Sequence, residues 1–140
     1  MKIFREYSQS QRFLLPPSLD EFVPENHEAR IINDVVDTLD LSPLLVKYEG
    51  GGAPAYHPAM MLKVIIYAYS RDIYSSRSIA QELKTDTAFM FLSGLQSPDF
   101  RTICLFRAEH TDVLPSLYVE VVRLCASLGM VGLGHIAFDG

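Results

Sequence analysis

The sequence predicts a mainly α-helical protein, and three observations support this fold class. Apolar residues make up 49% of the 140 residues, which is enough for one buried core and too many for a disordered chain. Between residues 26 and 128 the apolar side chains recur mainly at helical spacing, interrupted by proline and glycine. Beyond Gly129, residues 134–138 instead have the pattern of a β-strand. We therefore expect an irregular arm over residues 1–24, a compact helical domain over 25–128 and the start of a further domain over 129–140.

Helix start signals divide the first half of the domain. A helix is expected over about 26–39, with five apolar residues turned inward: Ile31, Ile32, Val35, Val36 and Leu39. Ser42-Pro43 predicts the start of a short helix, because the serine hydroxyl can cap it and proline suits the first turn. His57-Pro58 predicts a helix that runs to about Ser70 and is apolar on nearly all sides. We expect this helix to be the central buried element.

Three short helices should follow in close succession, over 76–84, 86–93 and 98–110. This is the helix-turn-helix-like arrangement that many bacterial proteins use to hold DNA. Ser97-Pro98 repeats the pattern of a capping hydroxyl followed by proline. A longer helix is expected over 112–128, and its few polar residues form one narrow stripe, so it should be buried on most sides.

Charge and composition limit the function. The net charge of −5 argues against a free-standing nucleic-acid-binding protein, but residues 47–107 carry seven basic and five acidic side chains and are the only positive part of the chain. The longest apolar run, residues 59–69, is interrupted by Lys63 and is too short to span a bilayer. Cys104 and Cys125 fall inside predicted helices and are expected to be reduced, buried thiols, so we expect a cytoplasmic protein without a membrane partner.

The helix over 76–84 carries the first candidates for DNA contact. Arg77, Gln81 and Lys84 share one face, because residues three, four and seven apart lie on the same side of a helix. We expect this face to contact the DNA backbone. The next helix offers almost no hydrogen-bond donors over residues 87–92, so its aromatic side chains are expected in the core and it should be a poor reader of bases.

The helix over 98–110 carries the other candidates. Its inner face is expected to consist of Phe100, Ile103 and Cys104. Arg101 and Thr102 lie on the outer face near the helix start, where they could contact phosphates or base edges, although an ordinary solvated face explains them equally well. Arg107 falls on the inner face, so we expect it to pair with an internal carboxylate or carbonyl and not with DNA.

The histidines give no evidence for a metal site. His27 and His57 are interpreted as helix-start residues. His110 and His135 lack metal-ligand spacing with any acid or cysteine, and no cofactor motif is present, so we expect no cofactor in this chain.

Five motifs occur in an order that is typical of one family. They are Leu15-Pro16-Pro17-Ser18-Leu19-Asp20-Glu21-Phe22-Val23-Pro24-Glu25-Asn26-His27, Pro54-Ala55-Tyr56-His57-Pro58, Ser75-Ser76-Arg77-Ser78-Ile79, Pro98-Asp99-Phe100-Arg101-Thr102-Ile103 with Phe106-Arg107, and Phe138-Asp139-Gly140. Over roughly residues 13–140 the chain resembles the N-terminal (InsH-type) domain of bacterial insertion-sequence transposases of the DDE class. One departure is Asp72, where the family commonly has glycine.

The resemblance implies a protein that recognises the terminal inverted repeats of a mobile element in double-stranded DNA and moves that element. It also implies a ribonuclease-H-like domain in which two aspartates and a glutamate hold Mg²⁺ or Mn²⁺, and a homo-oligomer for the full-length protein. Asp139 matches the first of these carboxylates, although Asp139-Gly140 also fits an ordinary turn. On this interpretation the chain ends in the first strand of a truncated catalytic domain, expected to be extended and poorly ordered or paired with another chain. The chain should then be catalytically inactive alone.

A second hypothesis comes from a different class of protein. The acidic net charge and the apolar helices over 58–70 and 112–128 are also typical of a non-catalytic helical interaction module. Such a module would mediate or inhibit transposase assembly.

Overall fold

The computed structural model describes residues 3–12, 14, 17–48 and 56–129. Within these ranges the chain is mainly helical and contains no strand, which confirms the mainly α-helical class. The elements are η1 (Leu19–Phe22), α1 (Glu28–Thr38), α2 (Ser42–Leu45), η2 (Val46–Tyr48), α3 (Pro58–Ser70), α4 (Ser76–Thr85), α5 (Thr87–Ser93), α6 (Phe100–Glu109) and α7 (Leu114–Ser127). The predicted strand over 134–138 and Asp139 lie outside the described residues.

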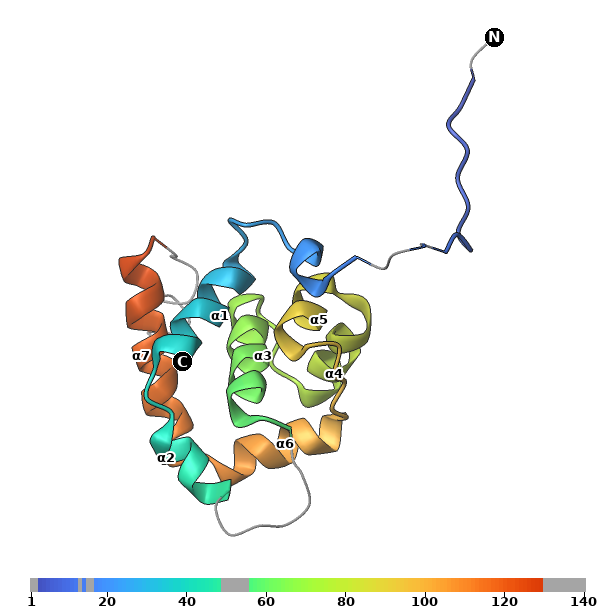
Figure 1. Ribbon diagram of the computed structural model, residues 1–140. Coiled ribbons are helices and arrows are strands. Elements are labelled where there is room, and N and C mark those ends of the chain that lie inside the picture. Colours follow the sequence, from blue (N-terminus) through green and yellow to red (C-terminus); the bar gives the residue numbers. More distant parts are fainter. Residues whose placement is uncertain (1–2, 13, 15–16, 49–55, 130–140) are drawn as a thin grey trace.

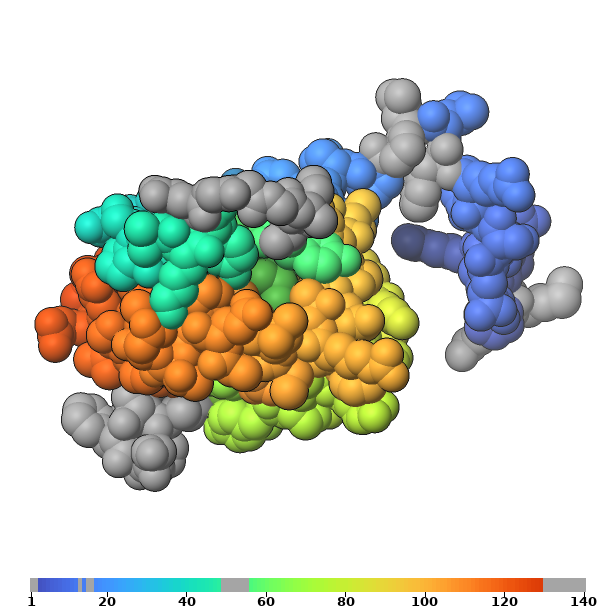
Figure 2. Space-filling view, turned by 90° about the horizontal axis from the view of Figure 1, so that it is seen from below, coloured from blue at the N-terminus to red at the C-terminus, as the bar shows by residue number. Residues whose placement is uncertain are grey.

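Helix α3 is the central element, as its composition predicted. It packs against α1, α4 and α5, and its side chains from Val64 to Ala68 are all buried. Lys63 is the polar exception, and its ammonium group pairs with the carboxylate of Asp37 on α1 at 2.7 Å. Figure 1 shows α3 with α1 and α7 on one side and α4 and α5 on the other. Seen from below, α6 crosses the underside of the body with α2 beside it (Figure 2).

The two histidines that were predicted to start helices do so. The ring Nδ1 of His27 accepts a hydrogen bond from the Ala29 N–H, and that of His57 accepts one from the Ala59 N–H, each at 3.0 Å. Both rings satisfy one of the free backbone donors at a helix start. The interpretation of His27 and His57 as helix-start residues is therefore confirmed.

Ser42-Pro43 begins a short helix as predicted, but in neither Ser-Pro pair does the serine hydroxyl cap the helix. Ser42 lies inside α2, and the carboxylate of Asp40 accepts hydrogen bonds from its N–H at 3.0 Å and from its hydroxyl at 2.5 Å. Helix α6 begins at Phe100 instead of residue 98, because Asp99 is its cap and accepts from the Thr102 N–H at 2.9 Å. In both cases a nearby aspartate, which caps as well as serine, supplies the acceptor.

Helix α7 is buried on one face only, which corrects the prediction that most of its sides are covered. Its buried side chains are Leu117, Val121, Val122 and Cys125. The helix lies at the edge of the body and packs on α1 (Figure 1), so one stripe alone can face the core. Val119, Leu124 and Leu128 remain exposed.

Arg30 joins the start of the chain to the helical body. Its guanidinium group donates to the carbonyl oxygens of Val23 at 2.7 Å and Pro24 at 3.0 Å, pairs with Asp20 at 2.9 Å and lies 5.0 Å from the ring centre of Phe91. Val23 is buried, so the body begins before residue 25. No helix in the described part of the chain is long and apolar enough to cross a membrane.

Candidate nucleic-acid interface

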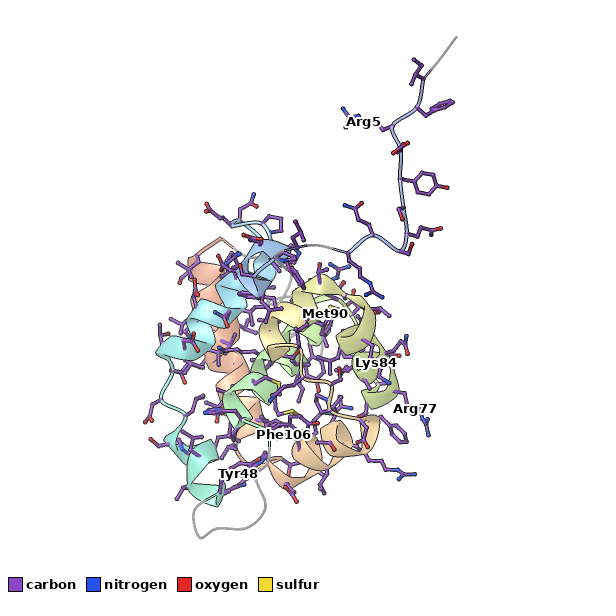
Figure 3. The ribbon with its side chains drawn as sticks, turned by 45° about the vertical axis from the view of Figure 1, so that its right-hand side comes forward. Arg5, Tyr48, Arg77, Lys84, Met90 and Phe106 are labelled. Atoms are coloured by element: carbon purple, nitrogen blue, oxygen red, sulfur yellow. The ribbon has the colours of Figure 1, made fainter. Side chains whose placement is uncertain are left out.

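Helix α4 presents three of the predicted DNA contacts on its outer side. The helix starts at the hydroxyl of Ser75, which accepts a hydrogen bond from the Ser78 N–H at 3.1 Å. Its buried face consists of Ile79 and Leu83. Arg77, Gln81 and Lys84 are all exposed, and Figure 3 shows Arg77 and Lys84 along the outer side of this helix.

Phe100 brings the basic side chains of two helices together. The guanidinium carbon of Arg77 on α4 lies 3.8 Å from the centre of the Phe100 ring, and that of Arg101 on α6 lies 5.6 Å from it. A cation close to an aromatic face is attracted by the negative charge of the ring face. Arg77 and Arg101 therefore belong to one surface, which we call the basic face together with Gln81 and Lys84.

The cations of the basic face form no ion pair with the residues that the structure describes. No carboxylate in those ranges lies within ion-pair distance of Arg77, Lys84 or Arg101. The nearby Asp99 caps α6, and hydrogen bonds from Thr102, with a smaller contribution from Arg101, hold the pKa of its carboxyl group below the usual value. Guanidinium groups gathered around one ring repel each other, and an anion bound between them would relieve that repulsion.

Thr102 differs from the other candidates. Its hydroxyl group donates to the Asp99 carboxylate at 2.9 Å, as part of the helix cap. The side chain is half-buried and lines a separate cavity with Tyr56 and Phe106. Thr102 therefore has no free hydroxyl proton to donate to a phosphate.

Arg107 pairs internally, as its place on the helix predicted. Its guanidinium group donates to the Tyr74 carbonyl at 2.6 Å, to the Tyr69 hydroxyl at 3.2 Å and to the Ser76 hydroxyl. Ser76 is the first residue of α4. Arg107 thus fixes the start of α4 against α6 and positions the basic face.

The rest of the inner face of α6 was predicted only in part. Ile103 is buried, but Cys104 is exposed and the second buried side chain is Phe106. Phe106 lines a cavity with Tyr48 and Met61, neighbours that the sequence of α6 alone does not reveal. Phe100 is half-buried because Arg77 covers it, and its function as a shared platform was not predicted.

Helix α5 places its aromatic side chains in or against the core, as predicted. Phe89 is buried, and Phe91 is half-buried beneath Arg30. Across residues 3–12, 14, 17–48 and 56–129, no three histidine, cysteine, aspartate or glutamate side chains gather in a way that could hold a metal ion. Asp139 lies outside those residues.

The fold and the basic face define a helical module with exposed cations on two packed helices. The family model described as Transposase domain (DUF772) matches residues 17–109, from η1 to the end of α6. The match covers well over half of the chain, and the chain belongs to this transposase-domain family. Searches of curated proteins and of solved structures found no match.

Proposed function

We propose that this chain is the DNA-binding part of an insertion-sequence transposase and that its basic face contacts the terminal inverted repeats of the element. The observation that supports this most directly is the pair of arginines on Phe100, which lacks a carboxylate partner within the described ranges. Because the chain belongs to the transposase-domain family, DNA is the ligand expected at such a surface. The consecutive helices α4, α5 and α6 would serve as a helix-turn-helix-like unit.

The residues of the basic face would have different tasks. Arg77, Lys84 and Arg101 would donate to phosphate oxygens, because cations neutralise the DNA backbone and fix the register of the protein. Gln81 lies between the two cations of α4 and can donate and accept, so it would contact the backbone or a base edge. Arg107 would act only by positioning α4.

Salt-dependent binding tests the proposal. Fluorescence anisotropy would measure binding to a duplex that carries the terminal repeat and to a scrambled duplex of equal length. Alanine at Arg77, Lys84 or Arg101 should weaken binding and reduce the slope of log K against log salt by about 1 for each lost phosphate contact. Arg123 provides the matched control, because it is exposed on α7, away from α4 (Figure 1). An Arg123→Ala variant that loses as much affinity as Arg77→Ala would contradict the proposal.

The DDE class of the enzyme is a further part of the proposal and rests on the sequence resemblance. Asp139 would be the first of three carboxylates that hold Mg²⁺ or Mn²⁺, and such metal ions activate the attacking oxygen and stabilise the leaving oxygen. Because several carboxylates must converge to hold these ions, we expect no strand cleavage by this chain alone in either metal. Robust cleavage by the purified chain would overturn that expectation.

The exposed apolar side chains along α7 favour the second candidate function. Val119, Leu124 and Leu128 are apolar and exposed on this one helix, as expected of a module that mediates or inhibits transposase assembly. A chain that forms a stable dimer in light scattering but binds neither duplex would favour this alternative over DNA binding.

A further inference from the structure

The N-terminal arm exposes large apolar side chains. Ile3, Phe4 and Tyr7 are 93%, 84% and 87% exposed, and none of them belongs to the core. The arm extends away from the helical body, and Arg5 lies well apart from it (Figure 3). Burial of such side chains is favourable, so a run of them near one end indicates a surface that receives them.

The body contains a cavity that suits one of these side chains. It lies between α3, α6 and α7, has a volume of about 290 Å³ and has a mainly apolar lining. Leu62 and Ile66 line it from α3, and Leu114 lines it from α7. An aromatic side chain would find apolar contacts here on more than one side.

Two polar groups at this cavity could bind a carboxylate. Arg107 lines it, and no carboxylate within the described ranges lies at ion-pair distance from its guanidinium group. The hydroxyl group of Tyr118 is buried and makes no hydrogen bond. Burial raises the pKa of Tyr118 to about 12, so the hydroxyl stays protonated and remains a donor. A carboxylate would accept from both groups, and buried donors are normally paired.

We propose that the arm of one copy of this chain docks in the cavity of a second copy, with Phe4 among the apolar side chains and Glu6 at Arg107 and Tyr118. In an extended chain, residues two apart point to the same side and lie about 6.6 Å from each other. Phe4 and Glu6 would thus enter the cavity together, while Arg5 would point away. Two copies can exchange arms reciprocally, which closes a symmetric dimer.

A second copy of the chain fits these observations better than DNA or the arm of the same chain does. DNA would pair with Arg5 and leave Phe4 exposed to water. The chain's own cavity is lined by α7, whereas η1 at the base of the arm packs on α5, and Figure 1 shows α5 and α7 on opposite sides of α3. The proposal does not depend on DNA binding, so the two can fail separately.

Sedimentation velocity of the 140-residue chain over a range of concentrations tests the proposal. The chain should form a dimer, and Phe4→Ala should raise its dissociation constant by at least about tenfold, as expected for an aromatic anchor. Glu6→Gln should raise it severalfold. Glu25→Gln is the matched control, because Glu25 is exposed outside the arm, and it should leave the constant unchanged.

A substitution at the cavity provides the second measurement. Thr111 is exposed at the cavity, so Thr111→Trp should fill the space and abolish both the dimer and the binding of a labelled peptide of residues 1–12. Circular dichroism would show whether this variant folds, and the arm variants decide the question if it does not. A chain that is monomeric at all concentrations, or a dimer that survives Phe4→Ala, would overturn the proposal. So would arm substitutions that weaken DNA binding but leave the oligomeric state unchanged.

Discussion

Replacing Arg107 and Arg101 by methionine should separate the positioning of the basic face from DNA contact. Arg107→Met removes three donated hydrogen bonds, to Tyr69, Tyr74 and Ser76. Hydrogen bonds from a charged group contribute about 1.5–3 kcal/mol each. Arg107 is only half-buried, so water can replace part of them, and we expect a total loss of about 2 kcal/mol. For a chain of this size that corresponds to a fall of roughly 5–8 °C in the thermal midpoint.

Arg101→Met is the matched change on the same helix. The structure shows Arg101 in no ion pair within the described residues, and its ring contact with Phe100 at 5.6 Å contributes about 0.5 kcal/mol at an exposed site. Its thermal midpoint should hardly move. Its DNA affinity should fall, with a salt slope reduced by about 1, because a phosphate contact is lost.

Calorimetry and anisotropy on the same preparations would measure both effects, at one fixed protein concentration because self-association also shifts the midpoint. At temperatures where both variants are folded, Arg107→Met should retain the salt slope of the unaltered chain. The opposite pattern, in which Arg107→Met stays stable but loses the salt-dependent contact, would refute the assignment of the two arginines.

Three further predictions concern single residues. Leu95 has a φ of 66° and is 59% exposed, so Leu95→Asn should raise the free energy of unfolding by about 1 kcal/mol in denaturant titration, because asparagine tolerates this left-handed conformation better; an unchanged midpoint would count against strain there. Burial and, secondarily, Lys47 hold the pKa of His110 below its usual value, so the unfolded chain binds a proton that the folded chain excludes. The thermal midpoint should therefore fall between about pH 7 and pH 5, and His110→Phe should flatten this dependence; equal slopes would contradict it. A thiol reagent should label Cys104 rapidly and Cys125 only after denaturation, because Cys104 is exposed whereas Cys125 is buried and its pKa is raised to about 11.

The helices were predictable because their signals are local. The apolar run after His57 predicted α3 as the central helix, and both histidine caps were recognised from their place before a proline or an apolar-periodic segment. The prediction went wrong where two local signals compete. At α2 the Asp40 carboxylate accepts from the N–H and hydroxyl of Ser42, and at α6 Asp99 is the cap instead of Ser97.

The composition of helix faces was less predictable, because it depends on the neighbours of each helix. Cys104 and Phe106 lie on opposite sides of α6, each beside the buried Ile103. Phe106 lines a cavity with Tyr48 and Met61, and these neighbours do not follow from the sequence of α6 alone. The contact between Arg77 and Phe100 joins α4 and α6, which α5 separates in the sequence. No pattern within one helix could reveal it, so the candidates of α4 and α6 were predicted separately although they form one surface.

The turn that leads into α4 helps to position the basic face. Asp72 has a φ of 60°, which is the conformation that glycine adopts without strain and that aspartate adopts more readily than most residues. The carboxylate of Asp72 also accepts a hydrogen bond from the Tyr74 hydroxyl at 3.0 Å, and the Tyr74 carbonyl in turn accepts from Arg107. The left-handed backbone at residue 72 thus places the carbonyl that Arg107 needs in order to hold the start of α4 against α6. The turn requires a left-handed backbone conformation at residue 72. Glycine adopts this conformation without strain, and Asp72 adopts it with the help of a local hydrogen bond from Tyr74.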